Sequence, residues 1–322
     1  MPLIEKSTYR PPAWLRGAHL QTIHPALFRR VAPVTNRRER LELEDGDFLD
    51  LEWSGGKGNR LAILSHGLEG SPRANYIQAM ARALMKRGWD VLAWSFRGCG
   101  GEPNRLPAFY HSGKTGDLET IIRHALSVHP AEWIDLIGFS LGGNLTLKYL
   151  GERGGETHPK IRRAVAFSAP CDLACCAASL EQAENAIYME RFMKTLRAKV
   201  REKHGRFPES FDLTGLKKIR TFTEFDGRFT APLNGFRDAE DYWKRSSSRP
   251  FRPAIAIPTL LVNAQNDPFL GPSCYPREEA EASTHLHLEI PAEGGHVGFG
   301  AGREYWSETR AVEFLAALGR RT

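Results

Sequence analysis

Residues 134–150 read IDLIGFSLGGNLTLKYL, an apolar run followed by Gly-Phe-Ser-Leu-Gly and then by a helical pattern. The spacing Gly138-x-Ser140-x-Gly142 is that of a nucleophile elbow, in which a strand enters a sharp turn and a serine stands at its apex in a strained conformation. β-Prone residues precede the turn, and apolar residues at helical spacing follow it. The stretch therefore predicts a strand, a reactive Ser140 and a helix.

The composition favours one large domain. The chain has 322 residues, of which 41% are apolar, and it has no low-complexity linker and no internal repeat. We therefore expect a single domain over residues 1–322. The start, MPLIEKSTYRPPAW, lacks a signal-peptide pattern, and no run approaches the roughly 18 apolar residues of a membrane-spanning helix. These features predict a soluble cytoplasmic protein without stable membrane insertion, and they leave peripheral membrane contact and the oligomeric state open.

Charge and cysteine content argue against two classes of function. The net charge of +6 is spread along the chain and is not joined to an aromatic-basic RNA motif, so we expect no nucleic-acid partner. The five cysteines lack paired metal spacing or a nearby histidine that would complete a zinc site. They are Cys99, Cys171, Cys175, Cys176 and Cys274. We expect small buried thiols, with no metal and no cofactor.

Strand and helix patterns alternate on both sides of the elbow. The expected strands are Leu61–Ser65, Asp90–Phe96, Arg163–Ser168, Thr259–Asn263 and His285–Ile290, and the expected helices are Tyr76–Arg87, Asp117–Val128 and Ala311–Leu318. A hairpin over Leu41–Trp53, turning at Asp45-Gly46, precedes them. This alternation predicts an α/β fold with a mostly parallel central sheet flanked by helices, and it places functional loops at the carboxyl ends of the strands.

Two segments depart from the alternation. Residues 171–250 are rich in helical patterns and too long for a simple loop, which predicts a helical cap inserted over the sheet. One face of a helix in this segment carries Tyr188, Phe192, Leu196 and Val200, a stripe that fits core packing or the wall of an acyl-chain site. Residues 1–40 form an N-terminal arm, whose large apolar side chains we expect to be buried. These are Trp14, Leu15, Leu20, Ile23 and Leu27.

A serine nucleophile needs a base, and the base needs an orienting carboxylate. On an elbow scaffold these partners follow in the order Ser, Asp, His, each after a later strand. Asp267 lies just beyond the strand at 259–263, and His296 lies on a Gly-Gly loop after the last strand. The order and placement predict a catalytic triad of Ser140, Asp267 and His296.

An acyl-transfer intermediate needs two preorganised N–H donors for its oxyanion. One expected donor is the backbone N–H of Leu141, directly after the nucleophile. The other is expected from Leu68, in the loop that follows the strand at 61–65. His66 competes as a base, but its position at the strand end favours a bracing role. His24 and His111 are weaker candidates for the base, and Asp117 and Glu119 are most simply partners of a helix dipole. Residues 98–101 are too short and badly placed for a phosphate loop.

These residues resemble the α/β-hydrolase superfamily, and within it the YheT-like esterases, relatives of the eukaryotic abhydrolase-domain lipases. The resemblance extends over about residues 10–318 and rests on eight blocks. They are PAWLRGAHLQT (12–22), SHGLEGS (65–71), FRGCGG (96–101), YHSG (110–113), GFSLGGN (138–144), FDGRFT (225–230), NDPF (266–269) and GGHVGF (294–299). The resemblance implies an α/β-hydrolase fold, the same three triad residues, and cofactor-free hydrolysis of short-chain esters or monoacylglycerols.

The sequence thus predicts a serine carboxylesterase acting on a small-molecule or lipid ester. Phe139, Phe269, Phe299 and the cap are candidates for lining an apolar acyl site. Two alternatives stay open: an acyltransferase that uses the same triad with another acceptor, and a catalytically silent hydrolase fold that binds a lipid or another ligand.

Overall fold

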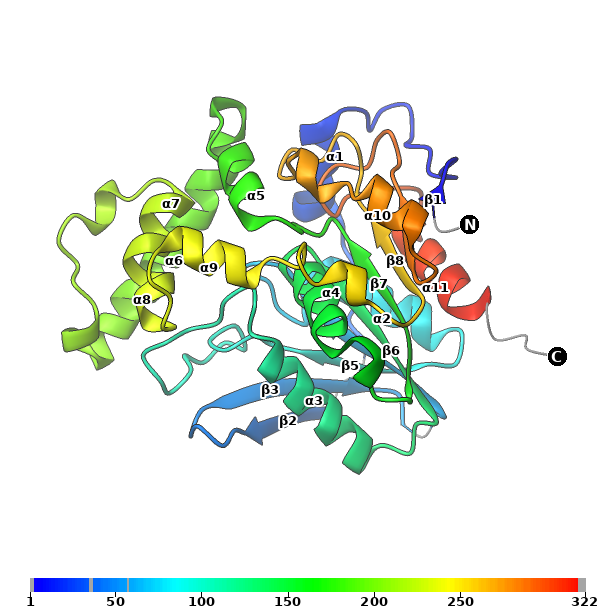
Figure 1. Cartoon of the computed structure of the whole chain (residues 1–322), viewed down its shortest axis with the longest axis horizontal. Coiled ribbons are helices and arrows are strands. Elements are labelled where there is room, and N and C mark those ends of the chain that lie inside the picture. The colour runs from blue at the N-terminus through cyan, green and yellow to red at the C-terminus, as the bar shows by residue number, and fades with distance from the viewer. Residues whose placement is uncertain (1–2, 35–36, 57, 318–322) are drawn as a thin grey trace.

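The computed structural model describes residues 3–34, 37–56 and 58–317. Its centre is a nine-stranded sheet with the order β1-β9-β8-β7-β6-β4-β5-β3-β2 (Figure 1). The strands are β1 Leu3–Ile4, β2 Arg37–Glu42, β3 Phe48–Ser54, β4 Arg60–Ser65, β5 Asp90–Trp94, β6 Trp133–Phe139, β7 Ile161–Phe167, β8 Thr259–Val262 and β9 Leu286–Glu289. Among the described strands, only the pairs β2–β3 and β3–β5 are antiparallel. The predicted mostly parallel sheet is confirmed.

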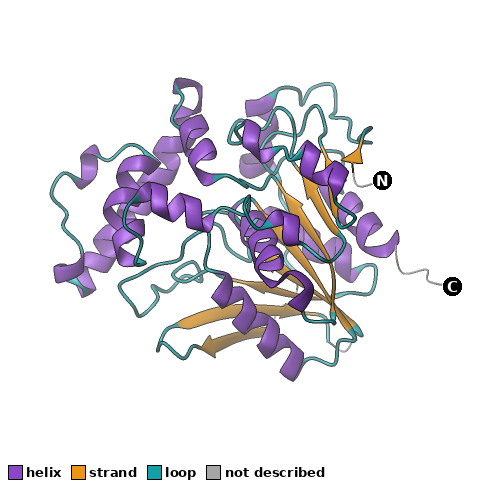
Figure 2. Ribbon diagram, in the orientation of Figure 1, coloured by secondary structure: helices purple, strands orange, loops and turns teal. Residues whose placement is uncertain are grey.

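Helices cover both faces of this sheet and also gather beside it (Figure 2). They are α1 Ala18–Phe28, α2 Asn75–Met85, α3 Thr115–Val128, α4 Leu141–Arg153, α5 Leu173–Leu180, α6 Ala186–Arg206, α7 Phe222–Phe225, α8 Ala231–Leu233, α9 Ala239–Ser246, α10 Arg277–Ala282 and α11 Trp306–Ala317. The last helix begins earlier than predicted because the Glu308 carboxylate accepts a hydrogen bond from the backbone N–H of Tyr305, which caps its first turn. The predicted final residue of this helix, Leu318, lies outside the described residues.

Two apolar layers lie on opposite faces of the sheet, because successive strand residues point to opposite sides. In β6, Ile134 and Leu136 pack with α3 and α4, whereas Ile137 and Phe139 pack with α2 and α11 on the other face. The alternation ends at Ser140, directly after Phe139. The nucleophile therefore stands at the carboxyl edge of the sheet, above a core that fixes its strand from both sides.

Helices α5 to α9 connect β7 to β8 and form a helical body at the left of Figure 1. Their apolar side chains build a third buried cluster, which includes Met193, Val200 and Phe225. In α6 the predicted stripe is used in two ways. Val200 is fully buried in this third cluster, while Phe192 and Leu196 border a cavity that also reaches Ser140.

The prediction for the N-terminal arm is wrong in part. Leu15 is buried, but Trp14, Leu20 and Leu27 are 62%, 43% and 48% exposed. For the two leucines, the physical reason is that helix α1 turns a polar pair inward: Gln21 and Thr22 are buried and hydrogen-bond to the loops that follow β8 and β9. Trp14 precedes this helix, and among the described aromatic rings it packs only on that of His24. Residues 1–2 and 35–36 of the predicted arm lie outside the described residues.

Within the described part of the chain, no helix combines the length and the apolar character needed to cross a bilayer.

Candidate active site

The nucleophile elbow has the strained geometry that its sequence predicts. Ser140 has φ 52° and ψ −120°, a left-handed conformation that is rare for a residue with a side chain. Glycines make the turn sterically feasible. A Cβ on Gly138 would lie 2.2 Å from the carbonyl oxygen of Gly142, and a Cβ on Gly142 would lie 2.3 Å from that of Ser65. The close approach of β6, α4 and the end of β4 thus projects Ser140 from the edge of the sheet.

The structure brings Ser140, Asp267 and His296 into one hydrogen-bonded chain. Nε2 of His296 lies 2.8 Å from Oγ of Ser140, and its Nδ1 lies 2.9 Å and 3.0 Å from the two carboxylate oxygens of Asp267. Since a carboxylate only accepts hydrogen bonds, Nδ1 carries the proton and Nε2 is left as the acceptor for the serine hydroxyl. This is the arrangement that general-base activation of a serine requires.

The histidine is held in place from three sides. Its ring stacks on Phe269, with 4.0 Å between centroids. Its backbone N–H donates to Thr22 Oγ1 at 2.9 Å. Gln21 Oε1 accepts from the side-chain amide of Asn266 and from the backbone N–H of Gly294, which joins the aspartate loop to the histidine loop.

Sequence reasoning missed these supporting roles of Gln21 and Thr22. The available signal was the polar pair Gln21-Thr22 between the apolar residues Leu20 and Ile23.

The loop after β4 approaches the nucleophile closely. A Cβ on Gly67 would lie 3.1 Å from Cβ of Ser140, and both Leu68 and Leu141 border the same cavity as Ser140. Leu141 is the first residue of α4, where backbone N–H groups have no partner within the helix. The two residues predicted to supply oxyanion donors therefore border the cavity in which Ser140 would meet a substrate.

Glu69, which follows Leu68, is held by Tyr110 and by Lys199 of the helical insertion. Glu69 has a left-handed φ of 54°, its N–H donates to the hydroxyl of Tyr110, and that hydroxyl donates back to its carboxylate. Lys199 of α6 donates to the same carboxylate at 2.7 Å. Burial alone would lower the pKa of Lys199, but the neighbouring Cys99 and Glu69 outweigh it, so that its pKa is raised. The insertion thus contacts the loop of the proposed oxyanion donor through a charged hydrogen bond, a contact that no local sequence pattern indicates.

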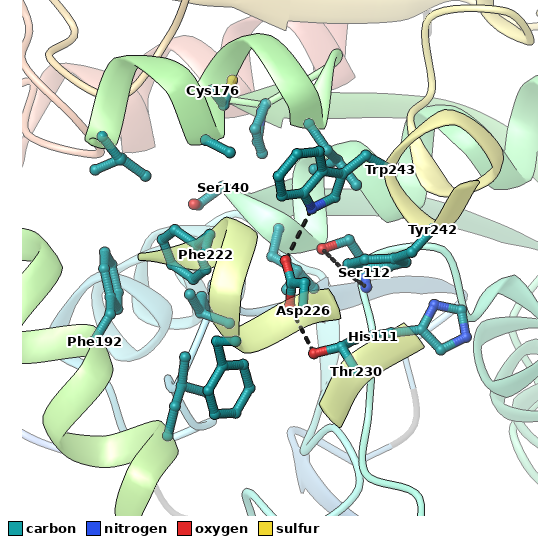
Figure 3. A pocket seen from close by; sticks show the side chains of 18 of the residues that line it. His111, Ser112, Ser140, Cys176, Phe192, Phe222, Asp226, Thr230, Tyr242 and Trp243 are labelled. Atoms are coloured by element: carbon teal, nitrogen blue, oxygen red, sulfur yellow. Dashed lines mark hydrogen bonds between the residues drawn. The ribbon is translucent and has the colours of Figure 1, made fainter. Parts of the chain in front are cut away.

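The cavity at Ser140 lies between the edge of the sheet and the helical insertion and has a volume of about 110 Å³ (Figure 3). Most of its wall is apolar, from α5, α6, α7 and α9. Phe269 lines it as predicted. Phe139 and Phe299 do not: they pack with Phe167 in the core on the far face of the sheet, because Phe139 alternates away from the side that carries the cavity.

The competing histidines take other positions. His66 is fully buried; its Nδ1 lies 2.7 Å from the carbonyl oxygen of Gly67, and its Nε2 accepts from the N–H of Phe96, so it braces the loop. Burial lowers its pKa to about 4. His111 borders the cavity, and its Nδ1 accepts from the backbone, while His24 lies between aromatic rings of the arm.

The charged and sulfur-containing candidates are also placed. Asp117 does more than face a helix dipole, because it binds Arg97 through two hydrogen bonds of 2.7 Å and 2.9 Å in the interior. Glu119 accepts from Arg123 and Tyr149. All five cysteines are free thiols, and within the described ranges no three His, Cys, Asp or Glu side chains are grouped so that they could hold a metal ion.

Comparisons with known proteins agree with this architecture. Residues 63–302 match the family described as the alpha/beta hydrolase fold. The chain is 35% identical over 316 residues to YheT of Escherichia coli (strain K12), described as a candidate esterase, covering 95% of this chain and 92% of that protein. It is 30% identical to phospholipase ABHD3 of Mus musculus, covering 91% and 73%. Among solved structures, the esterase Pf2001 of Pyrococcus furiosus matches with a TM-score of 0.60 at 18% identity, covering 91% and 98%.

Proposed function

The chain belongs to the α/β-hydrolase fold family and is a hydrolase, and we propose that it is a serine carboxylesterase that forms an acyl-enzyme on Ser140. The observation that carries the proposal is the continuous hydrogen-bonded chain from Ser140 through His296 to Asp267, with the serine in a strained conformation at a cavity. Relatives named as an esterase and a phospholipase support ester cleavage.

The proposed reaction follows from the geometry. Oγ of Ser140 attacks the ester carbonyl carbon while Nε2 of His296 takes the hydroxyl proton. Asp267 keeps the imidazole in the required tautomer and stabilises the imidazolium. Backbone N–H groups of Leu68 and Leu141 donate to the oxyanion of the tetrahedral intermediate. His296 then protonates the departing alcohol, and a water molecule activated by the same nitrogen hydrolyses the acyl-enzyme.

The helical insertion, predicted as residues 171–250, is proposed to act as the cap that closes the acyl site. A cavity of about 150 Å³ lined by apolar side chains holds one benzene molecule. The volume of about 110 Å³ beside Ser140 therefore suits a short acyl group better than a long one. We accordingly propose short-chain esters as the preferred substrates, ahead of monoacylglycerols with long chains.

The test is hydrolysis of p-nitrophenyl esters from acetyl to palmitoyl by the wild-type protein and by Ser140→Ala. We expect turnover that peaks at short acyl chains and disappears in Ser140→Ala. A peak at palmitoyl would contradict the assigned chain length. Equal turnover by Ser140→Ala would contradict the assigned nucleophile.

A further inference from the structure

A buried carboxylate inside the cavity has no role in the proposed triad. Asp226 borders the cavity together with Ser140 and is 8% exposed. It begins a π-helix, Asp226–Thr230, an uncommon element that often occurs at functional sites. Its oxygens accept hydrogen bonds from Thr230 Oγ1 at 2.6 Å and from Trp243 Nε1 at 2.8 Å, as Figure 3 shows.

Both of these donors are neutral, so they orient the carboxylate without cancelling its charge. Among the described residues that line the cavity, none is a lysine or an arginine. His111 supplies no positive charge either, because burial, followed by the neighbouring cations, lowers its pKa to about 3. Burial raises the pKa of Asp226 to about 6, against the opposing effect of the hydrogen bonds from Thr230 and Trp243, so the group is mostly ionised at pH 8.

A buried anion without a cationic partner costs free energy, and a bound cation would recover part of it. The surrounding side chains suit such a ligand. The rings of Trp243, Tyr242 and Phe222 border the cavity next to Asp226, and aromatic faces attract organic cations, most strongly when water is excluded.

We propose that Asp226 anchors a cation subsite, so that the ester cleaved at Ser140 carries an organic cation of the trimethylammonium type, bound by the carboxylate and by the neighbouring aromatic rings. The inference rests on the proposed esterase function and adds the chemical class of substrate to it. The methyl groups of such a cation would contact the apolar wall, and its charge would face Asp226, the one carboxylate among the described residues that line the cavity.

The test uses two pairs of esters that differ only in charge. Choline butyrate and 3,3-dimethylbutyl butyrate place a cation or its neutral isostere in the alcohol. p-Nitrophenyl 4-(trimethylammonio)butanoate and p-nitrophenyl 5,5-dimethylhexanoate do so in the acyl group. At pH 8 we expect the wild-type kcat/KM for the charged member of one pair to exceed that for the neutral member by roughly tenfold or more. The pair that shows the preference identifies which part of the ester enters the cavity.

Asp226→Asn should bring that ratio close to one. The matched control is Asp212→Asn, which removes a carboxylate on the exposed surface of the same insertion and should leave the ratio at the wild-type value. Ratios near one for both pairs in the wild-type protein, or a preference that survives in Asp226→Asn, would overturn the proposal. The esterase function is tested separately: if the wild-type protein hydrolyses none of these esters, or if Ser140→Ala hydrolyses them equally well, the proposed function fails whatever the role of Asp226.

A binding measurement keeps the subsite testable without turnover. Titration calorimetry with tetramethylammonium should show saturable binding to the wild-type protein and to Ser140→Ala, weakened at least about tenfold in Asp226→Asn. Neopentyl alcohol, which has a similar shape and no charge, should bind the wild-type protein and Asp226→Asn alike. Absence of tetramethylammonium binding to the wild-type protein would overturn the proposal whatever the esterase assays show.

Discussion

Replacing Lys199 by methionine tests how the helical insertion supports catalysis. The Lys199 ammonium donates to Glu69 Oε1 at 2.7 Å and to Cys99 Sγ at 3.2 Å, and it lies 4.9 Å from the centre of the Tyr110 ring. Methionine keeps most of the apolar stem but removes the charge. The carboxylate of Glu69 is then left with one donor, the Tyr110 hydroxyl, in a site where its side chain is only 11% exposed.

The size of the effect follows from this burial. Removing one member of a fully buried ion pair costs about 3–5 kcal/mol. Lys199 retains 19% exposure, so we expect a loss nearer to that of a hydrogen bond to a charged group, about 2–3 kcal/mol in the free energy of unfolding. Glu69 also holds a left-handed φ that costs about 1 kcal/mol or more. With less support, the loop should relax and move the N–H of Leu68.

Complete loss of one oxyanion donor lowers kcat by about a hundredfold to a thousandfold. A displaced donor should cost less, so we expect kcat of Lys199→Met for p-nitrophenyl butyrate to fall by roughly tenfold to a hundredfold, with a smaller change in KM. Urea denaturation measures the stability term independently. Lys199→Arg should recover most of both losses because it restores a cationic donor.

The matched control is Lys194→Met, since Lys194 is an exposed lysine on the same helix. It should keep wild-type stability and kcat. If Lys199→Met loses stability but keeps its kcat, the contact is only structural, and the reasoning that links α6 to the oxyanion donor is refuted.

Three further substitutions test other parts of the account. Asp267→Asn should lower kcat in steady-state assays by about ten-thousandfold, while circular dichroism shows that the fold is retained. Near-normal turnover would contradict the role given to the carboxylate. Gly142→Ala places a Cβ 2.3 Å from the carbonyl oxygen of Ser65, so we expect no native protein by circular dichroism; a folded, active variant would refute the steric argument. Burial raises the pKa of Asp135 to about 6, above its unfolded value, so its ionisation destabilises the folded state as pH rises through that interval. Asp135→Asn keeps an acceptor for Trp89 Nε1 and removes the buried charge. Urea denaturation should show a gain of up to about 3 kcal/mol in the free energy of unfolding at pH 8 and almost none near pH 4. Equal gains at both pH values would contradict this cause.

The sequence alone was sufficient to predict features that depend on the order of neighbouring residues along the chain. The strand, Gly-x-Ser-x-Gly and helix of residues 134–150 predict the elbow because a sharp turn between these elements tolerates only small residues at two positions. Asp267 and His296 could be named because each lies in the loop that follows a strand of a parallel sheet, and the carboxyl ends of such strands share one edge. The structure places both within hydrogen-bonding distance of their expected partners.

Features that depend on contacts between distant segments could not be predicted. Lys199 looks like any solvent-exposed lysine on a helix until the insertion folds against the loop at Glu69. Asp226 is part of a recognisable block, but only the folded insertion places it in the cavity of Ser140. The burial expected for Leu20 and Leu27 fails because helix α1 uses its inward face for the polar contacts of Gln21.

The central claim is that Ser140 is an activated nucleophile, and labelling by a fluorophosphonate probe tests it most directly. Mass spectrometry of the treated protein should show one adduct, mapped by peptide analysis to Ser140, and no adduct on Ser140→Ala. His296→Ala should slow the labelling strongly, because the hydroxyl then lacks its base. An adduct on another residue, or undiminished labelling of Ser140→Ala, would contradict the account.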